Sequence, residues 1–367
     1  MRESKNSLYD IYHEMVTDCE KWLYYKHANC YIDMETIFLP SKSQNFLHEY
    51  FTAGGKLEAF KWIEQDENFK MTDFRANHTV SAFLIGIVLR DELHMSMKAL
   101  PNIESKDRDN FLYFWSLTCL YHDISFQIEK NSLEYISKCD NLNDFYRLFK
   151  IEYKLVNDMK DNEQSKLIKN YFKFRLSQQT IDHGISGALL LYDALMKNYH
   201  EAMNTKKIKA NTTFEYNGLR FSREHKDGVR KISETIARHN MWLANPLSIQ
   251  EYKKYNLDIL IPNEKKSCII SFGDEHNLLF LLGLIDSIEP IKCLAEESNF
   301  DSYSVLKNLN ITFSYKKFEI EVNSSAEIID KYFNRIKGII SWLDIELFKD
   351  DTTLKIKINK HEKQRTD

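Results

Sequence analysis

Side chains of the kind that bind metals interrupt the most apolar segments of this sequence. Four histidines and two aspartates stand at the edges of apolar runs of helical length: His78, His122, Asp123, His183, His239 and Asp286. Burying a neutral polar group without a partner costs roughly 1–3 kcal/mol, and an unpaired charge costs several. A fold that buries these runs must bring the polar groups together. A divalent cation satisfies them, because His and Asp are common nitrogen and oxygen ligands.

The composition favours helices. The 367 residues include only 10 glycines and 5 prolines, fewer than a turn-rich β architecture needs. We therefore predict a mainly α fold with apolar, buried helices at 75–93, 109–129, from 182 onward, 228–243 and 275–294. Charged and apolar residues alternate at helical spacing over 131–180, which predicts helices that face solvent.

Two segments have a strand pattern instead. Asn217-Gly218 stands between alternating apolar residues, which predicts a β-hairpin insertion near 213–221. Beyond residue 297 we expect one or two strands in 311–322, an amphipathic helix opened by Ser324 or Ser325, and a final strand at 353–359. The predicted units are an N-terminal helical extension (1–60), a helical core (61–296) and a small α+β C-terminal subdomain (297–367).

Charge and hydropathy exclude several classes of partner. The net charge of -4 gives no global basic field, so nucleic acid is an improbable partner. The longest apolar run, 278–285, is far too short to span a membrane. The N-terminus lacks the apolar segment of a secretory signal, and the six cysteines form no C-x-x-C pair. We expect a soluble, cytoplasmic protein without disulfides, and association between copies of the chain stays open.

The order of the six residues is more specific than any of them alone. They follow the pattern His…His-Asp…His…His…Asp, with gaps of 44, 1, 60, 56 and 47 residues. The local strings are LYHDIS, DHGISGALLLYDAL and LLFLLGLIDSIEP. Over roughly residues 70–296 this pattern resembles the HD-domain superfamily of metal-dependent phosphohydrolases, and is most similar to bacterial members with extra histidines for a second metal.

The resemblance implies a role for each residue. His78, His122, Asp123 and Asp286 would hold one divalent metal, and Asp123 would bridge to a second held by His183 and His239. His122 and Asp123 would be the catalytic pair. Two such cations would polarise a phosphoryl oxygen and lower the pKa of water between them. Mn, Fe, Ni or Zn suits these ligands better than Mg, which prefers an all-oxygen shell.

The sequence departs from the family pattern at two positions. Ser125 stands where the family commonly has Gly, which bears on local geometry more than on chemistry. Asn240 follows His239 where some members have a second histidine, so water or another group would complete the second metal; Asn240 could instead orient a neighbouring ligand. Since a mononuclear site needs only the other four ligands, His183 and His239 could also be ordinary core histidines.

Substrate contacts are less well specified. Arg75, Arg238, Lys197 and His94 neighbour the ligand-bearing segments and could neutralise a phosphate, although all four could equally be surface charges. The activity that this sequence indicates is hydrolysis of a phosphoester in a nucleotide or cyclic nucleotide. The alternatives are a catalytically silent HD nucleotide sensor, whose C-terminal subdomain would contact partners, and an HD-type single-strand nuclease of a bacterial defence system.

Overall fold

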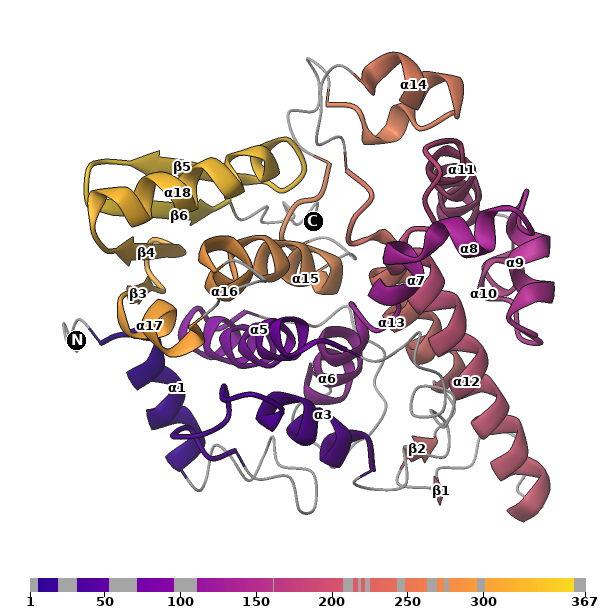
Figure 1. Cartoon of the computed structure of the whole chain (residues 1–367), viewed down its shortest axis with the longest axis horizontal. Coiled ribbons are helices and arrows are strands. Elements are labelled where there is room, and N and C mark those ends of the chain that lie inside the picture. Colours follow the sequence, from indigo (N-terminus) through magenta and orange to yellow (C-terminus); the bar gives the residue numbers. More distant parts are fainter. Residues whose placement is uncertain are drawn as a thin grey trace, which may run out of the picture.

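The chain is mainly helical, with a small antiparallel sheet near its C-terminus (Figure 1). The computed structural model describes residues 6–18, 32–52, 71–95, 111–160, 162–206, 214–216, 219–221, 225–242, 248–262, 269–273, 277–295 and 301–359. Within these ranges no helix is both long and apolar enough to cross a membrane.

Long helices, most of them built from apolar runs, form the centre of the molecule. They are α5 (Asp73–Glu92), α6 (Phe111–Tyr121), α12 (His183–Lys206), α13 (His225–Arg238) and α15 (Asn277–Ile288). Helix α12 packs along α13, α5 packs against α6 and α15, and α13 contacts both α6 and α15. Helix α15 is apolar on nearly all sides and is buried on nearly all sides, as expected for a helix in a protein interior.

The predicted metal-binding residues lie at or near the ends of these helices. The helix expected over 109–129 is in fact two, because α6 ends at Tyr121 and α7 spans Phe126–Lys130, so His122 and Asp123 lie in the turn between them. Residues 109 and 110 are outside the described residues. Asp182 caps α12 by accepting a hydrogen bond from the backbone N–H of Ile185 at 3.0 Å, and places His183 at the first helical position.

The two remaining helix predictions were too long at their C-terminal ends. Helix α13 ends at Arg238, so His239 follows the helix. The run predicted over 275–294 is divided into α15 and α16 (Pro290–Leu294). Pro290 has no backbone N–H to continue α15, and Glu289 caps the new helix by accepting hydrogen bonds from the N–H groups of Ile291 and Lys292.

Further helices, most of them short, surround this centre. The region 131–180 is helical as predicted, with α8 (Ser132–Ile136), α9 (Leu142–Leu148), α10 (Leu155–Asp158) and α11 (Glu163–Ser177). The other peripheral helices are α1 (Leu8–Thr17), α3 (Lys42–Thr52), α14 (Ile249–Lys254), the 3-10 turn η4 (Asp258–Leu260) and α17 (Ser302–Lys307).

The C-terminal sheet has the strand order β3-β4-β6-β5, and all its strand pairs are antiparallel. The strands are β3 (Asn310–Ser314), β4 (Glu319–Asn323), β5 (Ile345–Lys349) and β6 (Thr353–Ile358); α18 (Ala326–Ile336) and the 3-10 turn η5 (Lys337–Ser341) separate β4 from β5. The predicted β-α-β order omitted β5. This edge strand loses the alternation of buried and exposed residues after its first residue, so its sequence carries little strand signal.

The predicted β-hairpin is present. Strands β1 (Phe214–Tyr216) and β2 (Leu219–Phe221) pair antiparallel, with Tyr216 opposite Leu219. The turn residues Asn217 and Gly218 lie outside the described residues.

Candidate metal centre

The fold brings the side chains of the predicted residues into one buried cluster. His78 Nε2 lies 3.8 Å from Asp123 Oδ2 and 3.1 Å from Asp286 Oδ1. His183 Nε2 lies 3.0 Å from Asp123 Oδ1. The rings form a chain of edge-to-face neighbours, with centroid separations of 5.4 Å for His78 and His122, 5.4 Å for His122 and His239, and 5.3 Å for His183 and His239.

The cluster contains two groups of ligand atoms that share one carboxylate. In the first group, atoms of His78, His122 and Asp123 lie within 4.8 Å of one another; in the second, atoms of Asp123, His183 and His239 do. Each group could hold a metal ion. Asp286 lies beside the first group, since its Oδ1 is 3.4 Å from His122 Nε2.

Two of the imidazoles are oriented in a way that suits a metal ion. His122 Nδ1 lies 2.6 Å from the carbonyl oxygen of Cys119, and His239 Nδ1 lies 2.6 Å from that of Ile236. Because a carbonyl only accepts, each Nδ1 carries the proton and each Nε2 keeps its lone pair. Both Nε2 atoms are buried and lack a hydrogen-bond partner among the described residues. Buried lone pairs without a donor fit a metal ion at this position.

Carboxylates that our sequence analysis missed orient the other two imidazoles. His78 Nδ1 lies 2.8 Å from Glu289 Oε2, and His183 Nδ1 is hydrogen-bonded to Glu129 Oε2. Glu129 is itself held by Arg175, whose Nη2 donates to Oε1 at 2.7 Å. Such outer carboxylates fix the ring of a metal-binding histidine and make it more basic. The available sequence signal for Glu289 was its position immediately before Pro290, which suits a helix cap.

Two cations contact the carboxylates of the cluster. Arg75 Nη1 donates to Asp123 Oδ2 at 2.9 Å, and its guanidinium carbon lies 3.6 Å from the centroid of the Phe126 ring. Lys292 Nζ donates to Asp286 Oδ1 at 2.5 Å. Arg75 was among the predicted phosphate contacts, whereas Lys292 was not considered.

These contacts determine the protonation of the acidic ligands. Burial opposes ionisation of Asp123, but His122, His183 and Arg75 outweigh it and hold the pKa of this carboxyl well below its usual range. Burial is likewise outweighed at Asp286, where the ammonium of Lys292 and the neighbouring rings of His122 and His78 keep the pKa well below its usual range. Both aspartates are therefore carboxylates at neutral pH.

The histidines have divergent pKa values. Burial and the neighbouring His183 lower the pKa of His239 to about 3, so this ring is neutral. Burial also disfavours protonation of His183, yet hydrogen bonds to Asp123 and Glu129 prevail and raise its pKa to about 10. His183 therefore carries a proton until a metal displaces it.

Ser125 and Asn240, the two departures from the family pattern, both contact the segment that carries His183. The Ser125 hydroxyl donates to the carbonyl of His183 at 2.7 Å and lies 2.7 Å from Ser186 Oγ. A side chain on Gly187 would meet this hydroxyl at 3.1 Å, so the glycine leaves room for the serine. The Asn240 amide nitrogen lies 2.9 Å from His183 Nε2.

The other three predicted phosphate contacts pair or pack with residues outside the cluster, although Arg238 directly precedes His239 in the chain. Lys197 pairs with Asp193 and Glu152 well along α12, roughly 20 Å from His183 at about 1.5 Å per residue. His94 follows the far end of α5 and packs against Tyr315. Arg238 pairs with Glu234 on α13. Arg75 is thus placed at the cluster by its hydrogen bond to Asp123.

Comparison of the chain with family models, curated proteins and solved structures found no match. The structure thus defines a helical protein with a buried His/Asp cluster that is compatible with a metal site of the HD type.

Proposed function

We propose that this protein is a divalent-metal-dependent phosphohydrolase of the HD type, acting on a nucleotide or cyclic nucleotide. The observation that carries the proposal is the carboxylate of Asp123, which belongs to both groups of candidate ligand atoms. A carboxylate has two oxygens and can serve two cations, whereas a histidine Nε2 has one lone pair. When bound, two such ions would polarise a phosphoryl oxygen and supply a nucleophile from water near neutral pH.

Residues beside the cluster could bind the phosphate of the substrate and orient the metal-binding histidines. Arg75 lies beside Asp123 with its guanidinium stacked on Phe126, in a position to bind a phosphate oxygen through its planar donor fork. Lys292 lies beside Asp286 and provides a second positive charge for a phosphate. The outer carboxylates Glu129 and Glu289 keep the two histidines that they contact turned toward the cluster.

The test is phosphate release and product chromatography with added Mn²⁺ across nucleoside mono-, di- and triphosphates and cyclic nucleotides. We expect turnover of at least one class by the wild type and loss of most of it in Asp123→Asn, which keeps the size of the side chain but removes its charge. The matched control is Asp193→Asn. Asp193 is a buried aspartate on α12 that accepts hydrogen bonds from the backbone N–H groups of Glu152 and Tyr153.

Equal rates for the wild type and Asp123→Asn would show that the cluster is not the catalyst. Full metal occupancy without turnover of any of these nucleotides would contradict hydrolysis and support the sensor alternative.

Arg75 can be tested separately. Arg75→Lys keeps a positive charge but loses the planar fork, so kcat/KM should fall about ten-fold or more while metal stoichiometry is unchanged. Arg90→Lys is the control, since Arg90 lies near the other end of α5 and pairs with Asp91. Equal losses in both variants would argue against a substrate contact for Arg75.

A further inference from the structure

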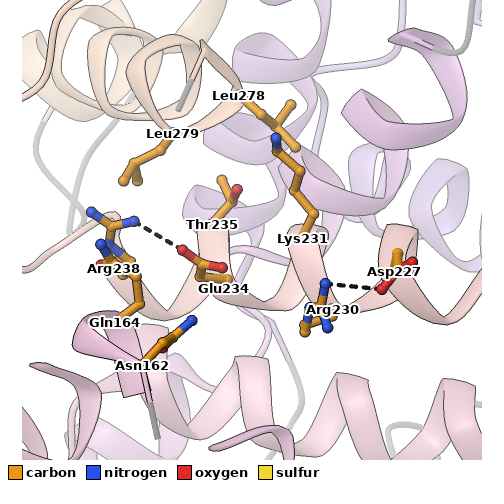
Figure 2. Close-up of a pocket in the computed structure, with 10 residues that line it drawn as sticks. All are labelled: Asn162, Gln164, Asp227, Arg230, Lys231, Glu234, Thr235, Arg238, Leu278 and Leu279. Carbon is orange, nitrogen blue, oxygen red and sulfur yellow. Dashed lines mark hydrogen bonds and ion pairs between the residues drawn. The ribbon is translucent and has the colours of Figure 1, made fainter. Parts of the chain in front are cut away.

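A separate pocket lies along α13. Figure 2 shows this pocket, whose volume is about 310 Å³. Its walls come from the start of α11, one face of α13 and the start of α15, and the residues that line it are Asn162, Gln164, Asp227, Arg230, Lys231, Glu234, Thr235, Arg238, Leu278 and Leu279. None of these lining residues belongs to the His/Asp cluster.

The basic side chains that line the pocket outnumber the acidic ones by one, which gives the pocket a small excess of positive charge. Its lining includes the basic side chains of Arg230, Lys231 and Arg238 and only two acidic ones, Asp227 and Glu234. Each acidic group is paired with an arginine, since Asp227 Oδ1 lies 2.9 Å from Arg230 Nη2 and Glu234 Oε1 lies 2.9 Å from Arg238 Nη1. These pairs hold the two guanidinium groups in the wall of the pocket, as drawn in Figure 2.

Arg238 makes the anion site more than a surface patch. Its side chain is only 8% exposed, so the charge faces little bulk water. Because the local dielectric constant is lower at such a site, this guanidinium interacts more strongly with a nearby anion than an exposed one would, although its pairing with Glu234 offsets part of the charge.

The neutral part of the lining suits an organic group beside the anion. Gln164 Oε1 is buried and has no hydrogen-bond partner within the described part of the chain. Leu278 and Leu279 form an apolar wall, and Thr235 adds a hydroxyl. A ligand that satisfies this lining combines an anionic group, a hydrogen-bond donor and a small apolar face. The volume is at the small end of the range for ligand pockets, which starts at roughly 300 Å³.

We infer that this pocket binds a small phosphate ester of the size of a nucleoside monophosphate, at a site separate from the His/Asp cluster. The phosphate contacts the basic side chains of α13. The organic part lies against the leucines of α15 and donates to Gln164. This inference does not depend on the proposed hydrolase activity.

The test is isothermal titration calorimetry on the full-length protein with chelator present, so that no metal contributes to binding. The probes are AMP, GMP, CMP and UMP, then inorganic phosphate and the unphosphorylated nucleosides. We expect at least one nucleoside monophosphate to bind the wild type and Asp123→Asn equally. Arg230→Gln and Lys231→Gln should each weaken this binding about ten-fold, because each removes one charge-assisted contact. Lys226→Gln, a lysine of α13 that pairs with Asp158 and does not line the pocket, should have no effect.

The remaining arms distinguish the parts of the site. Weaker binding of inorganic phosphate than of the monophosphate is expected and supports a contact with the organic part. Equal binding of the nucleoside and its monophosphate would overturn the anion site. Absence of binding at millimolar concentration would overturn the inference. Binding that Asp123→Asn abolishes but the α13 variants leave unchanged would assign the ligand to the His/Asp cluster instead.

Discussion

The ammonium group of Lys292 lies 2.5 Å from Asp286 Oδ1, and the two residues are six positions apart on the adjoining helices α16 and α15. Without metal, a lysine thus neutralises a carboxylate that the sequence pattern assigns to a metal ion. Burial disfavours a charged Lys292, but Asp286 and Asp123 more than compensate and raise its pKa. The lysine and a metal ion would therefore compete for the negative charge of the cluster.

Replacing this lysine should strengthen metal binding. Lys292→Met removes a positive charge a few ångströms from the first group of ligand atoms, so Mn²⁺ affinity should rise about ten-fold or more by simple electrostatics. Titration of Mn²⁺ followed by electron paramagnetic resonance of the free ion measures this. The control is Lys331→Met, an exposed lysine that bonds the carbonyl of Leu294. Weaker Mn²⁺ binding in Lys292→Met would show that the lysine supports the metal site rather than competing with it.

The outer carboxylate Glu129 should affect one group of ligand atoms and spare the other. Glu129→Gln removes the charge that holds His183 Nδ1, and loss of an outer partner typically costs 10–100-fold in metal affinity. Since His78 is held by Glu289, the first group should keep its affinity. At a free Mn²⁺ concentration that just saturates both groups of the wild type, the bound metal should then fall from two equivalents to about one. Unchanged stoichiometry would assign Glu129 a purely structural role.

The close approach of α12 and α13 provides a packing test. A Cβ on Gly184 would lie 2.9 Å from the carbonyl oxygen of Ile236 and 3.0 Å from the His239 ring, both too close. Gly184→Ala should therefore push the helices apart and cost roughly 1–3 kcal/mol of unfolding free energy, with weaker metal binding at the second group. The control is Gly338→Ala, where a Cβ would meet the Trp242 ring at 3.2 Å. It tests whether a packing change that does not involve the His/Asp cluster also weakens metal binding. Wild-type stability and metal content in Gly184→Ala would contradict the packing observed here.

Metal binding at His183 should release a proton. With its pKa raised to about 10, metal-free His183 is protonated at pH 8, whereas His239, with a pKa of about 3, is already neutral. A metal ligand must be unprotonated, so metal affinity should rise with pH up to about pH 10. Calorimetry of Mn²⁺ binding in two buffers of different ionisation enthalpy gives the number of protons released. If no proton is released at pH 8, His183 keeps its proton when the metal binds and is not a metal ligand.

The same shift sets the sign of a stability effect in the metal-free protein. Because the folded pKa of His183 exceeds its unfolded value, the protonated ring stabilises the fold fully below about pH 6.5, and this contribution is lost as pH rises toward 10. Denaturant unfolding of the chelator-treated protein between pH 6 and 10 measures it. A contribution of His183 that grows with pH, relative to His183→Gln, would contradict the assignment.

Apolar periodicity and residue spacing were sufficient to predict the β-hairpin and the helices that carry the cluster. They could not predict where those helices end, because helix ends depend on local contacts. The turn at His122 and Asp123 and the break at Glu289 are examples. Strand β5 was missed since an edge strand with little alternation resembles a loop.

The cluster itself could be predicted from the order of its residues, but its outer contacts could not. Glu129 and Lys292 lie in ordinary charged surroundings along the sequence, and only the packing of α7 and α16 brings them to His183 and Asp286. The same applies to Arg75. The sequence could not separate it from Arg238, Lys197 and His94 as a candidate phosphate contact, and the fold places it beside Asp123.

The most direct test of the metal centre is the metal content of the protein after dialysis against Mn²⁺ and desalting. Inductively coupled plasma mass spectrometry measures this content. The wild type should hold about two equivalents, because Asp123 is shared by two groups of ligand atoms. Asp123→Asn should hold close to none, while Asp193→Asn keeps the wild-type content. Wild-type protein without bound metal, or equal content in Asp123→Asn, would contradict a metal centre at this cluster.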